Sequence, residues 1–98
     1  MGLLIRIEAK SDRVREVEAM LRSALGHVRA ETATVVWFAL RLGPTTFGVF
    51  DASVDEANRQ AHLEADGETL QGPAAAELFA GQPSIERVDL IAAQLPGE

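Results

Sequence analysis

The residues with the clearest chemical potential are the two histidines of the chain, His27 and His62. An imidazole changes charge near neutral pH, so it can act as a general acid or base, and it can hydrogen-bond a phenolic or enolic oxygen. His62 falls in an expected helix one turn after Asn58 and beside Ala61, at the margin of the apolar face. We therefore take His62 as the candidate catalytic residue, with a structural histidine on the helix surface as the alternative.

Other residues have simpler first interpretations. His27 stands near the end of an expected helix, where a positive charge is favoured by the helix dipole, so a structural role is expected. Trp37 lies among apolar neighbours in an expected strand, which favours core or interface packing, with a pocket wall as the alternative. Arg41 and Asp51 fall near the two ends of an expected hairpin and are interpreted as a surface pair.

Several common catalytic and metal-binding motifs are missing from the sequence. It contains no Cys, no Gly-rich dinucleotide or phosphate loop, no His-Glu-x-x-His and no Gly-x-Ser-x-Gly. The two histidines are far apart in the chain, so no metal site is expected. Any catalysis would come from an apolar cavity with one or two polar groups and a substrate that is itself reactive.

The periodicity of apolar residues predicts the elements that must position these side chains. Strands are expected over residues 3–9, 33–42, 46–52 and 85–95. Helices are expected after an N-cap at Ser11, after a capping box formed by Ser53 and Glu56, and over residues 73–80. The second of these helices is expected to turn Val54, Ala57, Ala61 and Ala65 inward and to end or break at Gly67.

This order, β-α-β-β-α-(α)-β, predicts an α+β, ferredoxin-like domain with an antiparallel sheet that spans residues 1–98. Helices cover one face of such a sheet. Strands 33–42 and 46–52 are apolar on both faces, so the second face also needs cover. We expect a homodimer through the sheet face.

Composition excludes some partners. The 98 residues carry a net charge of −6, which opposes binding to nucleic acid or an anionic membrane. The apolar start of the chain meets Arg6 too early for a secretory signal or a membrane span. A cytoplasmic protein is expected.

Three segments together resemble the antibiotic biosynthesis monooxygenase family. They are Glu31-Thr32-Ala33 before the Trp37 strand, Phe47-Gly48-Val49-Phe50-Asp51, and Ala61-His62-Leu63. The resemblance covers nearly the whole chain and implies a dimeric α+β barrel. It also implies a monooxygenase that acts on a quinol, anthrone or related aromatic molecule without metal, flavin or any other cofactor.

The same resemblance assigns residues to the site. His62 matches the histidine of the family's helix and would orient or deprotonate the substrate oxygen, while Trp37 and Phe50 would line the cavity and Asn58 would contact the substrate. The chain has no Tyr, although several relatives use tyrosines in the pocket, and no Asn in its first strand, where haem-degrading relatives carry one. Haem degradation is therefore disfavoured.

Two other functions remain open at this stage. One is a binding or stress-related module of the same fold, whose cavity holds a small apolar or aromatic ligand unchanged. The other is a purely structural dimer in which the partner fills the apolar face and no cavity is left.

Overall fold

The computed structural model describes residues 1–30 and 34–94 of the chain. Within these ranges the elements follow the order that the sequence predicted. They are β1 (Gly2–Glu8), α1 (Val14–Arg29), β2 (Thr34–Arg41), β3 (Thr46–Ser53), α2 (Glu56–Leu70), α3 (Pro73–Leu78) and β4 (Ser84–Val88). No helix of this described part is long and apolar enough to cross a membrane.

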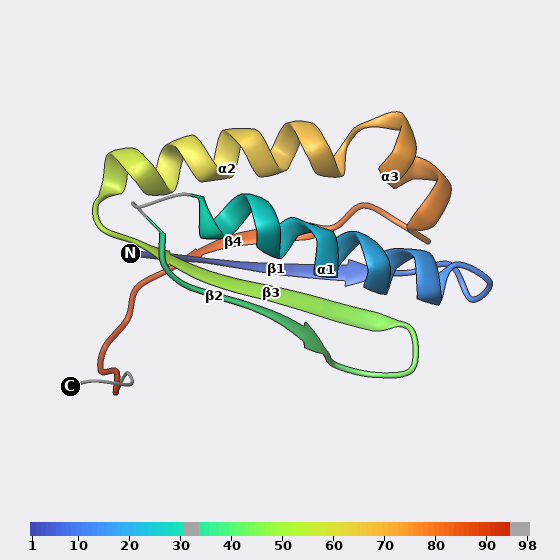
Figure 1. Cartoon of the computed structure of the whole chain (residues 1–98), viewed down its shortest axis with the longest axis horizontal. Helices are drawn as coiled ribbons and strands as arrows, with labels where there is room; N and C mark the ends of the chain where they lie inside the picture. The colour runs from blue at the N-terminus through green and yellow to red at the C-terminus, as the bar shows by residue number, and fades with distance from the viewer. Residues whose placement is uncertain (31–33, 95–98) are drawn as a thin grey trace.

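The strands form one antiparallel sheet in the order β2-β3-β1-β4. The helices lie together on one side of this sheet (Figure 1). The prediction of an α+β, ferredoxin-like arrangement is therefore confirmed.

The core lies between the sheet and the helices. Successive side chains of a strand point to opposite faces, so the alternating β1 residues Leu3, Ile5 and Ile7 share the helix-facing side, and each is nearly fully buried. From α1, Val17 and Leu21 pack into the same core. The helical layer thus buries one face of the sheet, which leaves the other face to be considered separately.

Over β2 and β3 the opposite face of the sheet is mainly apolar, whereas its β1–β4 side also carries Arg6, Glu8 and Glu86. No helix lies on this face in the described part of the chain (Figure 1). Leu4, Phe50 and Phe38 lie in register across β1, β3 and β2 on this side. Phe38 is 50% exposed, and its neighbours on the same face of the β2 end, Leu40 and Leu42, are 40% and 46% exposed. We call this surface, defined by Leu4, Val36, Phe38, Leu40, Leu42 and Phe50, the open face.

Both predicted helix caps were wrong. The α1 helix begins at Val14 after Arg13, and no side chain caps it. The chain turns at Ser11 and Asp12 instead, because the Arg13 N–H donates to the Lys10 carbonyl at 2.9 Å. Ser53 is the last residue of β3, and its N–H donates to the Met1 carbonyl at 2.8 Å. Ser53 therefore belongs to the sheet and does not cap the following helix.

The α2 helix is capped by Asp55, whose carboxylate accepts the Asn58 N–H at 2.8 Å. The helix continues through Gly67 to Leu70. The prediction that Val54 and three alanines face inward was wrong for Val54, Ala57 and Ala61, which are exposed. Ala65 is exposed as well, yet it lines a cavity between α2 and the sheet. Alanine has little apolar area to gain by burial. The side chains of α2 that are half-buried are larger or polar: Asn58, Arg59, Gln60, His62, Leu63, Asp66 and Leu70.

The last strand is shorter than the sequence predicted. β4 pairs only with β1, and the pairing ends where Val88 meets Gly2, the first residue of β1. Residues 89–94 form no strand in the structure, and Ile91 is 100% exposed there. The predicted end of this strand at Leu95, and the Glu31-Thr32-Ala33 segment, lie outside the described residues.

Glu8 at the end of β1 ties this strand to the β2–β3 turn. Its carboxylate accepts hydrogen bonds from the hydroxyl of Thr45 and, at 2.6 Å, from that of Thr46. These bonds, chiefly the one from Thr45, hold the pKa of Glu8 below its usual range. Because the folded-state pKa is lowered, the stabilisation is present at neutral pH and is lost as the pH falls through that value.

Replacing Thr45 by Val should therefore raise the pKa of Glu8 toward its ordinary value. The measurement is a ¹³C NMR titration of the Glu8 side chain in the wild type and in Thr45→Val. Thr69→Val, which makes the same change on α2, serves as the control and should leave the Glu8 titration in place. An identical Glu8 titration in Thr45→Val and wild type would contradict the assigned hydrogen bond.

Candidate functional site

A cavity of about 330 Å³ lies between α1, α2 and the helix-facing side of the sheet. Its walls are mainly aliphatic, with a small number of polar groups: Ile5, Ile7, Met20, Leu21, Ala24, His27, Val28, Trp37, Val49, Asp51, His62, Ala65, Asp66, Thr69 and Leu70. An apolar pocket with a few convergent polar side chains is the usual form of a small-molecule site. The expected apolar cavity is present, but it has five polar lining residues where one or two polar groups were expected.

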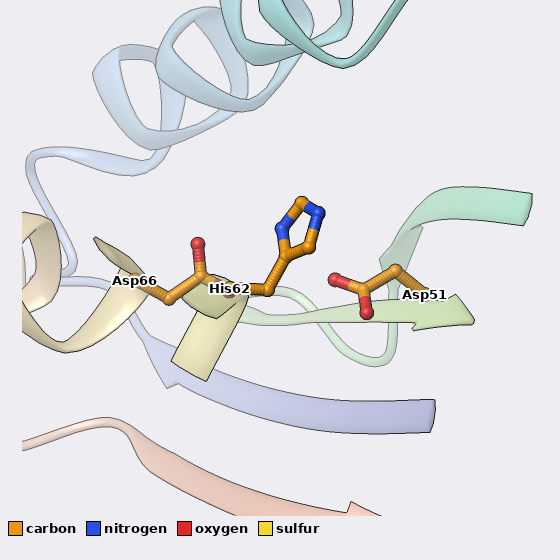
Figure 2. Close-up of side chains that lie close together, drawn as sticks. All are labelled: Asp51, His62 and Asp66. Carbon is orange, nitrogen blue, oxygen red and sulfur yellow. The ribbon is translucent and has the colours of Figure 1, made fainter. Parts of the chain in front are cut away.

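The polar groups of this cavity converge on one point. Asp51 from β3 and His62 and Asp66 from α2 each offer a ligand atom within 4.8 Å of the others. Figure 2 shows the His62 ring rising from α2 with the Asp51 carboxylate on one side of it and the Asp66 carboxylate on the other. Each of the three has an interaction partner in the structure. The cluster places a proton-accepting imidazole and two carboxylates at the wall of an apolar space.

Local structure explains why these groups meet. His62 and Asp66 are four residues apart on α2, so they lie one helical turn apart on the same side of the helix. Asp51 follows the period of β3, on which Phe47 and Val49 also point to the helices, and it is only 3% exposed. The β3 strand therefore carries the carboxylate directly into the core.

The interpretation of Asp51 and Arg41 as a surface pair was wrong. Asp51 is buried, whereas the guanidinium of Arg41 donates to Glu18 at 2.6 Å and lies 4.8 Å above the centre of the Phe47 ring. Arg41 and Glu18 belong to a second, more open groove of about 410 Å³ between α1 and β2. The burial of Asp51 has a signal in the sequence, because Asp51 continues the alternation of Phe47 and Val49 along β3.

The structure places the predicted site residues in three different environments. His62 and Trp37 both line the cavity. Phe50 does not, because it lies in register with Phe38 on the open face. Asn58 is not among the lining residues either, and its amide donates to the Asp55 carboxylate at 2.9 Å. The expectation that Phe50 and Asn58 form the same pocket as His62 was therefore wrong. The alternation of side chains along β3 turns Phe50 to the other face of the sheet, and Asn58 bonds to the residue that caps α2.

Sequence analysis also missed lining residues. His27 is exposed at the end of α1, as its expected position there implies, and it also contributes to the cavity wall. Asp66 was not predicted as a site residue, although it lies one helical turn from His62. The remaining wall comes from aliphatic side chains of both helices.

Solved structures of other proteins share the fold of this chain. A Caulobacter crescentus protein described as a putative antibiotic biosynthesis monooxygenase has a TM-score of 0.75 at 20% identity, over 93% of this chain and 89% of its own. A Nitrosomonas europaea protein with the same description has a TM-score of 0.77 at 15% identity, over 93% of this chain and 98% of its own. The fold is that of the antibiotic biosynthesis monooxygenase-like family, as the sequence resemblance implied.

A second Nitrosomonas europaea protein, NE2512, is much more similar. It shares 46% identity with this chain, covers 99% of it and 94% of its own length, and has a TM-score of 0.86. The chain belongs to the same family as NE2512, which is described as a protein of unknown function. No family model matches the sequence, and no curated protein matches it significantly.

The cavity should bind a small aromatic phenol, and the single Trp of the chain reports on it because Trp37 lines the wall. We expect 1-naphthol to quench Trp37 fluorescence saturably. Ala24→Phe, which fills the cavity from α1, should weaken this binding by roughly tenfold or more. The matched variant Ala19→Phe adds the same ring at an exposed position of α1. Equal affinities for Ala24→Phe and Ala19→Phe would show that the ligand binds elsewhere.

Proposed function

We propose that the protein is a cofactor-independent monooxygenase that oxidises a quinol, an anthrone or a related phenolic molecule in the cavity between its helices and sheet. The observation that carries this proposal is the position of His62, which lines the same aliphatic cavity as Trp37 and stands beside the Asp51 carboxylate. The fold shared with proteins described as antibiotic biosynthesis monooxygenases supports the same reaction class.

His62 takes the proton of the substrate hydroxyl or enol in this reaction. The nearby Asp51 carboxylate fixes the orientation of the ring, as carboxylates beside a catalytic imidazole commonly do. Trp37 offers an aromatic wall against which a planar substrate can pack. The surrounding aliphatic side chains keep water away from the resulting anion.

The anion then reacts with oxygen without help from another group. It transfers one electron to O₂, and the two radicals combine at carbon to give a peroxide. For an anthrone, loss of water from this peroxide leaves a carbonyl. One oxygen atom enters the product, and the other leaves as water with the two hydrogens of the oxidised carbon. Binding and deprotonation by the protein therefore supply the catalysis, since the substrate is the reductant.

His62→Ala should lower oxygen uptake by roughly 10²-fold or more, because it removes the general base. The measurement is oxygen consumption with product mass on a panel of reduced naphthoquinols and anthrones, using chelator-treated wild-type protein. His27→Gln is the matched control, because it alters the other histidine of the cavity wall while His62 is retained. Equal rates for His62→Ala and wild type would remove His62 from the mechanism.

The same assay separates the enzyme from a binding module. The oxygenase proposal would be contradicted if the compounds bind, as judged by Trp37 fluorescence, and are recovered chemically unchanged after hours. That outcome would favour a small-molecule-binding protein with the same cavity.

We further propose that the protein acts as a homodimer that pairs through the open face. Support comes from the three large apolar side chains Phe38, Leu40 and Leu42, which are each at least 40% exposed on one side of the sheet. Contiguous exposed apolar surface of this kind commonly marks an interface. A symmetric pair would place the open face of one copy against that of the other.

Phe38→Asp should convert the dimer to a monomer, because the charge would be buried at the interface. Light scattering at micromolar concentration measures the mass. Ala19→Asp places the same charge on the exposed side of α1 and should remain dimeric. A monomeric wild type would refute the interface.

A further inference from the structure

We propose that Asp51, His62 and Asp66 also bind a divalent transition-metal ion, and that this ion switches off the proposed oxygenase by occupying the nitrogen of His62. The binding itself follows from the geometry of the cluster. The inhibition rests in addition on the function proposed above.

The donor set suits a first-row divalent metal. One imidazole nitrogen and two carboxylate oxygens are typical ligands of Zn²⁺, Mn²⁺ and Fe²⁺, and an imidazole disfavours Mg²⁺ and Ca²⁺. The three ligand atoms lie within 4.8 Å of one another. Neighbouring donors bound to one ion at about 2.1 Å are about 3.0 to 3.4 Å apart, so the most widely separated pair has to close by up to roughly 1.5 to 2 Å. Rotations of both side chains of that pair together supply a movement of this size.

The charge of the cavity also favours a cation. Among the described residues that line it, Asp51 and Asp66 are acidic, and the two histidines are the only residues that can carry positive charge. A divalent ion balances both carboxylates at once. Its remaining coordination positions would open into the cavity.

The ligands come from two rigid elements. Asp51 is fixed by the sheet, in register with Trp37 of β2 and Leu3 of β1. His62 and Asp66 are fixed relative to each other by one turn of α2. Ligands held on a strand and a helix lose little freedom when the ion binds. The ion would also link α2 to the centre of the sheet.

Metal binding competes with the proposed catalysis because both use the imidazole of His62. A nitrogen that coordinates the ion has no lone pair left to accept the substrate proton. Asp66 separates the two roles, since the oxygenase proposal uses Asp51 and His62 only. Loss of Asp66 should weaken the metal site and leave the general base in place.

The test is the affinity of chelator-treated protein for Zn²⁺ and Mn²⁺ by titration calorimetry. We expect about one ion per wild-type chain, and Asp66→Asn should bind at least roughly tenfold more weakly. Glu68→Gln removes the same charge from an exposed position of α2 and should bind like the wild type. His27→Gln should also bind like the wild type, because His27 is not a ligand. Circular dichroism verifies that each variant is folded.

A second readout identifies the ligand directly. The chain has two histidines, so ¹⁵N NMR of the imidazoles contains two residues, which His27→Gln assigns. Added Zn²⁺ should shift a ring nitrogen of His62. Equal affinities for the wild type and Asp66→Asn, or a shift confined to His27, would overturn the metal site.

The inhibition is measured by oxygen uptake with added Zn²⁺. Each protein is compared with its own metal-free rate, and a given zinc concentration should remove a larger fraction of that rate from the wild type and Glu68→Gln than from Asp66→Asn. Full activity of the zinc-loaded wild type would refute the switch. If the metal-free wild type is itself inactive, the oxygenase proposal and the switch that rests on it both fail, whereas the calorimetry and NMR still decide the metal site.

Discussion

The buried carboxylate of Asp51 is the constraint on which the rest of the site depends. β3 lies inside the sheet, between β2 and β1, and its period sends this side chain under the helices. Burial of a charge is costly unless polar or charged groups surround it. α2 meets this need with His62, whose imidazole lies beside the Asp51 carboxylate, while Asp66 adds a second acidic group to the cluster. Ala57 and Ala61 of the same helix are exposed, so their apolar character was a poor guide to the orientation of the helix.

The two faces of the sheet have different proposed roles. Trp37 and Phe38 are neighbours in β2, yet Trp37 lines the cavity whereas Phe38 is half-exposed on the open face. The proposed chemistry therefore lies on the helix side, and the proposed interface lies on the other. A change on the open face can alter assembly without entering the cavity, and this separation makes the two proposals independently testable.

One cavity wall serves both proposed activities of the site. Deprotonation of a phenol needs the lone pair of His62, and coordination of a metal needs the same lone pair. The second carboxylate, Asp66, favours metal binding over deprotonation of the substrate, because it adds a negative charge and a third ligand one turn along α2. The response of the protein to metal thus depends on a residue that the oxygenase mechanism does not require.

The sequence by itself determined the order of the helices and strands and much of the core. The spacing of apolar residues along a segment and the residues that form turns are local properties of the chain. The alternation of Leu3, Ile5 and Ile7 and the Pro73 that opens α3 were legible in this way. Three features were decided only by the tertiary structure. Phe50 lies on the open face, Ser53 ends β3 and does not cap α2, and Asp51 lies close to His62 and Asp66. Those outcomes depend on which strand pairs with which and on how a helix rolls over a sheet, and both are set by contacts between residues distant in the chain.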